Sequence, residues 1–232
     1  RLPPRSTQGV SSAASDVYKR QFVLISTDKA VRPTNVMGAT KRAAEKLVQG
    51  LNALGKTRFI TVRFGNVLDS AGSVVPLFRE QIQAGGPVTV THPEVTRYFM
   101  TIPEACQLIL QAASVGQGGE IFVLDMGEPI LIRYLAEQMI RLSGKRVGQD
   151  IDIEFVGLRP GEKLTEELFL EAEKPMPTPH RKLLLARSVG QDLDQIGAMI
   201  ARLETEVDQF NEVELLSLLQ KLVPEFKEEK IG

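Results

Sequence analysis

The chain has one cysteine and two histidines among its 232 residues. A single cysteine excludes a disulfide within the chain, and the pattern "ACQLIL" around Cys106 predicts a buried, inert thiol. His92 and His180 lie far apart in proline-rich stretches, so we expect them in turns or at the surface rather than as metal ligands. The sequence therefore predicts no metal site.

An excess of charge and long hydrophobic runs are also missing. The formal net charge is −1, which is too small to gather nucleic acid or an anionic membrane surface. No apolar run approaches the roughly 18 residues that span a bilayer. We therefore expect no nucleic-acid partner and no membrane contact by this segment.

Residues 1–21, "RLPPRSTQGVSSAASDVYKRQ", lack hydrophobic periodicity and the apolar core of a signal peptide. The join to the apolar run "FVLIS" is abrupt. We interpret 1–21 as a leader that is disordered or foreign to the domain, and we exclude it from the prediction of the fold.

Beyond the leader, short apolar runs alternate with amphipathic stretches. A helix over 36–54, capped by Thr34 or Asn35, carries an apolar stripe that includes Val36, Ala39, Ala43, Leu47, Leu51 and Leu54. Strands are expected at 22–26, 58–64, 87–91, 120–125, 151–157 and 182–186. Further helices are expected at 74–86, 101–116, 130–144, 162–170, 190–206 and 212–222, with a proline-rich hinge at 174–180.

This alternation predicts an α/β fold with a doubly wound parallel sheet. Such sheets bind ligands beyond the carboxyl ends of their strands. "STDKA" follows the first strand and "GNVLDSAGS" the second, so both belong where a site is expected. No G-x-G-x-x-G motif for a dinucleotide pyrophosphate is present. We therefore expect the C-terminal part of a larger enzyme, inactive by itself and a weak binder of NAD.

Four motifs in order resemble the CapD/WbpM polysaccharide-biosynthesis family, the nucleotide-sugar 4,6-dehydratases among extended short-chain dehydrogenase/reductases. They are "STDKAVRPTNVMGATKRAAE", "VRFGNVLDSAGSVVPLFREQI", "GGPVTVTHPEVTRYFMTIPEA" and "GLRPGEKLTEEL". The resemblance covers about residues 22–190. It implies the C-terminal part of a Rossmann-like NAD domain at 22–66, an interleaved UDP-sugar lobe at 67–187 and C-terminal helices at 188–232.

The resemblance also implies a reaction. Bound NAD (NADP is less favoured) oxidises C4 of a UDP-sugar, typically UDP-N-acetylglucosamine; water is then eliminated across C5 and C6, and the hydride returns to C6. Asp28 is implied as the acid for the C6 hydroxyl and Lys29 as the base at C5. An acid and a base placed side by side suit this chemistry. Thr27 is implied to contact the sugar O4, and Lys41 to bind the nicotinamide ribose and to serve as the cation near Lys29.

Other roles are implied residue by residue. Ser26, Lys41, Asn66 and Ser73 are the expected cofactor contacts. The expected substrate contacts are Asn66, Val74, Pro76, Arg97 and Arg159. Gly65 and Gly72 are expected to let backbone approach a ligand. The two arginines are expected at the UDP diphosphate because a guanidinium binds phosphate oxygens two at a time, although a surface ion pair is the rival for Arg97. Glu162 is expected in the first turn of a helix.

Met37 stands four residues before Lys41. NAD-dependent sugar-modifying enzymes usually carry a catalytic tyrosine at this position. A thioether cannot exchange a proton with C4–OH, so Lys41, Lys29 or a water held by Thr27 must do so. Long, membrane-anchored members of the resembled family also carry methionine here, so we interpret Met37 as a subfamily mark at a catalytic position.

Three alternatives stay open: a nucleotide-sugar epimerase, which needs no Asp-Lys pair; an inactive nucleotide-sugar-binding module, which would explain Met37; and an assembly fragment that pairs through its terminal helices. For the complete protein we expect a cytoplasmic catalytic domain, with an inner-membrane anchor elsewhere in the chain an option, and a homo-oligomer.

Overall fold

The computed structural model describes residues 21–186 and 192–227, so the leader predicted at 1–21 lies outside the described residues except for Gln21. Within these two ranges, no helix combines the length and apolar character needed to cross a bilayer. The same ranges contain no cluster of three or more His, Cys, Asp or Glu side chains suited to a metal ion.

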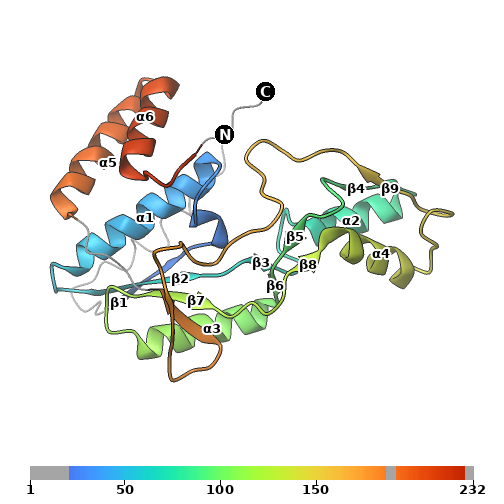
Figure 1. Cartoon of the computed structure of the whole chain (residues 1–232), viewed down its shortest axis with the longest axis horizontal. Helices are drawn as coiled ribbons and strands as arrows, with labels where there is room; N and C mark the ends of the chain where they lie inside the picture. The colour runs from blue at the N-terminus through green and yellow to red at the C-terminus, as the bar shows by residue number, and fades with distance from the viewer. Residues whose placement is uncertain (1–20, 187–191, 228–232) are drawn as a thin grey trace, which may run out of the picture.

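A five-stranded sheet forms the centre of the larger lobe (Figure 1). In spatial order its strands are β1 (Gln21–Ile25), β2 (Arg58–Arg63), β7 (Ile121–Leu124), β11 (Leu183–Ala186) and β10 (Pro175–Pro177). The first three are parallel, and β11 and β10 are added antiparallel. The expected hinge at 174–180 contains β10, an edge strand, where prolines are tolerated. The predicted α/β Rossmann-like class is confirmed.

Helices cover both faces of this sheet. α1 (Val36–Asn52) lies on one face and α3 (Ile102–Val115) on the other (Figure 1). Successive strand residues point to opposite faces, and β2 follows this rule. Ile60 and Val62 belong to the apolar core beneath α3, whereas Arg63 reaches a glutamate of α1.

The C-terminal helices α5 (Leu193–Asp208) and α6 (Glu212–Leu222) form a hairpin on the outer side of α1. Their apolar stripes pack with Ala39 and Ala43 of α1. The stripes are thus partly buried within the chain, whereas Val207, Phe210 and Val213 of the hairpin stay exposed.

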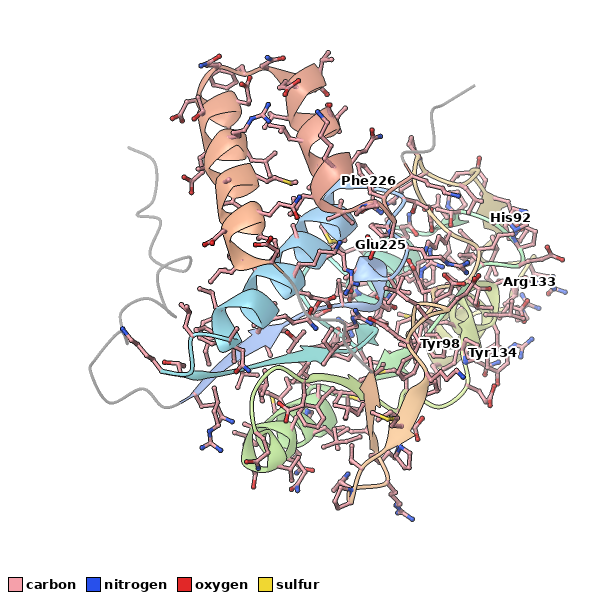
Figure 2. All side chains as sticks on the ribbon, turned by 60° about the vertical axis from the view of Figure 1, so that its left-hand side comes forward. His92, Tyr98, Arg133, Tyr134, Glu225 and Phe226 are labelled. Carbon is pink, nitrogen blue, oxygen red and sulfur yellow. The ribbon has the colours of Figure 1, made fainter. Side chains whose placement is uncertain are left out.

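The chain after α6 returns to the start of α1. Phe226 is buried in the same cluster as the helix hairpin, and Glu225 accepts a hydrogen bond from Arg42 at 3.1 Å (Figure 2). The backbone N–H of Lys227 donates to the Pro33 carbonyl at 3.1 Å. The tail is therefore fastened to the segment that leads into α1.

The smaller lobe has its own apolar core, built around α2 (Val74–Gln83) and α4 (Ile132–Leu142). Its short strands are paired as β3 (Asn66–Val67) with β6 (Phe99–Met100), β4 (Val88–Val90) with β9 (Ile153–Phe155), and β5 (Thr96–Arg97) with β8 (Ile130–Leu131). The lobes are joined where β2 ends and β3 begins (Figure 1).

Three predictions about single segments are wrong. Residues 162–170 form an irregular segment with bends rather than a helix. Cys106 is exposed, because α3 directs its neighbours Ala105 and Leu108 into the core instead. The stripe of α1 is shorter than expected, since Val36 and Leu54 are exposed and the helix ends at Asn52.

Candidate active site

The loop after β1 holds the Asp28-Lys29 pair. Backbone N–H groups of Ser26 and Asp28 continue the parallel ladder to β2, bonding the carbonyls of Val62 and Phe64. A short 3-10 helix, η2 (Asp28–Ala30), follows, capped by the Thr27 hydroxyl, which accepts from the Lys29 N–H. Asp28 is fully buried. The end of the sheet therefore sets the position of this pair.

The Lys29 ammonium joins three segments of the chain. Its Nζ lies 3.1 Å from Asp28 Oδ1 and 3.1 Å from Asn66 Oδ1 at the start of β3. It also lies 3.8 Å from Glu166 Oε1 of the 162–170 segment. The structure thus brings together the predicted residues Asp28, Lys29 and Asn66, and adds a second carboxylate.

A cavity of about 560 Å³ opens beside this cluster, between the two lobes. Seven of the residues predicted for the site line it: Lys29, Met37, Asn66, Ser73, Val74, Arg97 and Arg159. Apolar side chains of α2, β4 and α4 complete one wall. A volume of this size suits a small organic ligand.

Five other predicted residues do not line the cavity: Ser26, Thr27, Asp28, Lys41 and Pro76. The Ser26 hydroxyl donates to Glu45 Oε1 at 2.6 Å, in a buried ionic network. The Thr27 hydroxyl donates to Asp28 Oδ1 at 2.8 Å, directly behind Lys29. Pro76 is half-buried in the first turn of α2. Ser26 is therefore engaged away from the cavity, while Thr27 and Asp28 support its wall.

Met37 and Lys41 lie on the first two turns of α1. Asn35 caps this helix by accepting from the Gly38 N–H at 2.9 Å. A Cβ on Gly38 would lie 2.2 Å from the Lys29 carbonyl oxygen, so glycine is required where the helix meets η2. Met37 is half-exposed at the cavity. Lys41 donates to the Ile25 carbonyl at 3.2 Å, and its amine is not in contact with that of Lys29.

Arg97 holds the cavity wall together. The residue is 7% exposed, and its guanidinium donates to the carbonyls of Thr96, Lys163 and Leu164. It also forms an ion pair with Glu162 at 2.8 Å. The rival considered for Arg97 was an ion pair at the surface. The pair found here is part-buried, and the guanidinium is largely committed to protein acceptors.

Glu162 is not a helix residue, contrary to prediction. Besides Arg97, its carboxylate accepts from the Thr91 hydroxyl at 2.9 Å and from the Arg159 N–H at 3.1 Å. Glu162 therefore fixes the position of the Arg-Pro-Gly turn at residues 159–161.

The same turn is fastened to the segment before α1. Gly161 has φ +67°, a left-handed conformation that suits glycine. Its carbonyl accepts from the Thr34 hydroxyl at 2.7 Å and from Asn35 Nδ2 at 3.1 Å. Arg159 is exposed, and its guanidinium makes no hydrogen bond to the described part of the chain. It is a charged group free to bind a ligand at the cavity.

Glu166 is the site residue that the sequence did not reveal. It is 6% exposed, lines the cavity, and its Oε2 has no hydrogen-bond partner within the described ranges. Burial raises the pKa of Glu166; the Lys29 charge opposes this rise and the Asp28 charge adds to it. Glu167 pairs with exposed Arg32. The sequence pattern does not distinguish Glu166 from Glu167, because the two differ in burial only once the segment is packed beside the cavity.

The glycines of the loop after β2 differ in their surroundings. A Cβ on Gly65 would meet Tyr98 at 2.9 Å and Asp28 Oδ2 at 3.1 Å, so this glycine serves internal packing. Gly72 has φ +74° and open space around it. It precedes Ser73, the N-cap residue of α2, whose side chain makes no capping hydrogen bond. The Ser73 Oγ is buried without a partner within the described residues.

The residues present fit one end of a nicotinamide dinucleotide. The unpartnered Ser73 hydroxyl and the Asn66 amide line the cavity, and the amine of Lys41, on α1, donates to the Ile25 carbonyl at the end of β1. The 232 residues contain no G-x-G-x-x-G turn for the pyrophosphate. The described residues thus fit the nicotinamide end of the cofactor, and no pyrophosphate cradle is identified in them.

Comparison with known proteins identifies relatives. The polysaccharide biosynthesis protein family matches residues 5–188, a range that includes much of the segment interpreted as a leader. The capsular polysaccharide biosynthesis protein CapD of Staphylococcus aureus is 50% identical over 97% of this chain and 34% of its own length. A UDP-glucose 4-epimerase of Rickettsia rickettsii is 35% identical over 81% of this chain and 54% of its own length. The chain spans only about a third to a half of these relatives.

Solved structures share the fold. Pen from Bacillus thuringiensis has a TM-score of 0.69 and 36% identity, covering 81% of this chain and 58% of its own. DesIV, a dTDP-glucose 4,6-dehydratase of Streptomyces venezuelae solved with NAD bound, has a TM-score of 0.56 and 18% identity, covering 64% of this chain and 51% of its own. The match of the family to most of the chain and the identity to CapD agree. The chain belongs to the polysaccharide biosynthesis protein family.

Proposed function

We propose that the complete protein catalyses NAD-dependent 4,6-dehydration of a UDP-N-acetylhexosamine for surface polysaccharide or glycan synthesis. The observation that carries this proposal is the 3.1 Å contact between the Lys29 ammonium and the Asp28 carboxylate at the end of β1. Elimination of water across two carbons needs a base and an acid side by side. Similarity to CapD supports the biosynthetic context, and NAD in the solved neighbour DesIV supports the cofactor.

The chain's own residues would handle the protons. NAD, when bound, would supply the chemistry of a reversible hydride acceptor for C4 and C6. Lys29 takes the C5 proton, which the C4 ketone makes acidic, and Asp28 donates a proton to the departing C6 hydroxyl. Asn66 Oδ1, 3.1 Å from Lys29 Nζ, orients the amine. The product is a 4-keto-6-deoxy sugar and one water.

Arg159 is the proposed ligand of the UDP diphosphate. Its guanidinium makes no hydrogen bond within the described ranges, whereas that of Arg97 is occupied by Glu162 and three carbonyls. Planar guanidinium groups bind phosphate oxygens in pairs. We assign diphosphate recognition to Arg159 and a supporting role to Arg97.

Met37 leaves the proton of the C4 hydroxyl to another group. Lys41 is engaged with the Ile25 carbonyl. The Thr27 hydroxyl is 2.8 Å from Asp28 Oδ1, which offers a route from a water or sugar hydroxyl beside Thr27 to a carboxylate. This contact favours Thr27 and Asp28 among the available routes.

Epimerisation of a nucleotide sugar is the second candidate, favoured by the 35% identity to the Rickettsia epimerase. An epimerase eliminates no water, so the Asp28-Lys29 pair would have no acid–base task at C5 and C6. A binding module without turnover would retain Arg159 and explain Met37. These two alternatives and dehydration give different products from one incubation.

The test is incubation of the full-length protein with UDP-N-acetylglucosamine and NAD in heavy water, followed by mass spectrometry and NMR. Dehydration predicts loss of one water and solvent deuterium in the sugar, and Asp28→Asn should abolish both. A C4 epimer of unchanged mass would replace this proposal with epimerisation. Unchanged but bound substrate would favour the inactive module, and Met37→Tyr would then test the cause.

A further inference from the structure

Two buried carboxylates share the Lys29 ammonium. Asp28 comes from the end of β1 and is fully buried, and Glu166 comes from the distant 162–170 segment and is 6% exposed. Each uses one oxygen toward Lys29. The other oxygen of each, Asp28 Oδ2 and Glu166 Oε2, is buried without a hydrogen-bond partner among the described residues. One cation therefore faces two acids, each with one buried oxygen that has no partner among the described residues, and such buried oxygens require an explanation.

The two carboxylates are not equivalent. Asp28 Oδ1 accepts from the Thr27 hydroxyl at 2.8 Å and from Lys29 at 3.1 Å. Among the residues that the structure describes, the Glu166 carboxylate has only the longer contact to Lys29, at 3.8 Å. Hydrogen bonds to a charged form stabilise that form. Of the two acids, Glu166 therefore has fewer direct contacts that stabilise its charge.

Charges around Glu166 come from each element packed against it. Burial raises the pKa of Glu166. Lys29 on η2, Arg97 on β5 and Lys163 on the same segment lower it, and Asp28 on η2 raises it. The net result lies above the ordinary value, so the environment favours a proton on this carboxyl group.

A lysine acts as a base only as the neutral amine, so the proton of its ammonium needs an acceptor. From the position of Glu166 beside Lys29, we infer that Glu166 exchanges this proton with Lys29 during the reaction. The inference rests on the proposed dehydration. An N–H bond of Lys29 breaks and an O–H bond of Glu166 forms, with no change in oxidation state. The amine then takes the C5 proton, and the same exchange runs backward when C5 is protonated again. Glu166 acts through Lys29 and is a positioning residue in this sense.

Turnover of the full-length protein tests the exchange. Glu166→Gln retains the volume but cannot accept the proton, and we expect kcat to fall about 100-fold with KM nearly unchanged. The change in kcat with pH that reports the titration of Glu166 should also disappear. Glu166→Asp should recover part of the rate, because it restores a carboxyl group. Glu167→Gln is the matched control, since Glu167 pairs with Arg32 outside the cavity, and its profile should equal that of the wild type.

A second measurement is independent of turnover. Carboxyl ¹³C NMR of the 232-residue chain, with Glu166→Gln for assignment, follows the titration of Glu166 directly. We expect a midpoint above the ordinary glutamate value of about 4.3, and a further rise in Lys29→Met. An ordinary midpoint, or wild-type kcat in folded Glu166→Gln, would overturn the inference. Failure of the wild type to release water would instead refute the proposed function, and the titration would still report on Glu166.

Discussion

Lys29 is the side chain on which the proposed chemistry depends most directly. Lys29→Met retains the aliphatic stem and removes the amine, so we expect loss of dehydration by at least about 100-fold. The affinity for the UDP-sugar should change little, because Arg159 and the cavity walls remain. Kinetics and calorimetric binding measure the two effects separately.

Lys145→Met, an exposed change outside the cavity, is the control for this experiment. Equal loss of binding and turnover in Lys29→Met would make Lys29 a substrate ligand rather than a base.

Single residues were predictable where chemistry follows a strand. Asp28, Lys29 and Asn66 follow the apolar runs of β1 and β2, and parallel strands bring such positions to one edge of a sheet. Glu166 was not predictable, because its burial depends on closure of a distant segment against η2. Met37 was predicted at the site and lines the cavity; its role there stays a prediction.

Among the elements, the 162–170 segment shows how tertiary contacts override local preference. "EKLTEELFL" consists largely of good helix formers. A helix would need the carbonyls of Lys163 and Leu164 for its own backbone bonds. In the structure the Arg97 guanidinium takes both carbonyls, and the Thr96 N–H also bonds that of Leu164. The neighbouring strand β5 therefore keeps the segment from forming a helix, and the irregular segment places Glu166 beside Lys29.

The Arg-Pro-Gly turn should be sensitive to one methyl group. A Cβ on Gly161 would lie 2.6 Å from the Thr34 carbonyl oxygen, and φ is +67°. We expect Gly161→Ala to displace Arg159 and to weaken UDP-sugar binding about tenfold, equivalent to about 1.4 kcal/mol, as measured by calorimetry.

Gly157→Ala is the matched control, because Gly157 has φ +87° but nothing within 4 Å of a Cβ. Backbone strain alone would affect both variants, whereas the contact with Thr34 affects only Gly161→Ala. Equal loss of affinity in the two variants would refute the positioning role of the turn.

Across the whole molecule, a buried ionic network joins the sheet to α1 and to the chain before β10. Arg63 is fully buried and bonds Glu45 at 2.7 and 2.8 Å and Glu173 at 2.6 Å. Burial by itself would raise the pKa of Glu45, but the charges and hydrogen bonds of Arg63, with smaller contributions from Arg42 and Ser26, hold it below its ordinary value. The network therefore stabilises the fold only while Glu45 is ionised.

Removal of Arg63 should destabilise the protein strongly. Arg63→Met leaves Glu45 and Glu173 buried without their main partner, and we expect the free energy of unfolding to fall by about 3–5 kcal/mol. Because the folded pKa of Glu45 is depressed, its contribution is present above the ordinary value of 4.5 and is lost as the pH falls below it. Urea unfolding at neutral pH and at acidic pH should show the difference between variant and wild type shrinking with acidity.

Arg79→Met is the control, because the Arg79–Asp69 pair is exposed and such pairs contribute little. A loss for Arg63→Met no larger than that for Arg79→Met would show that the network is dispensable.

The general architecture was predictable because hydrophobic period and strand–helix alternation are local properties of the sequence. The antiparallel edge formed by β11 and β10 was not, since the pairing of distant strands depends on the whole sheet. The buried charges of β2 and α1 were also missed: a pattern of apolar residues marks a core but does not reveal that Arg63 and Glu45 are enclosed within it.

The tail after α6 has a practical consequence for anyone who purifies or labels this protein. Lys227 bonds Pro33, and the next two residues, Thr34 and Asn35, hold the Gly161 turn that carries Arg159. An affinity tag or fluorescent fusion placed after Lys227 would therefore lie close in sequence to a residue that bonds the segment holding the Gly161 turn. Substrate affinities should be compared only after such an addition has been cleaved off.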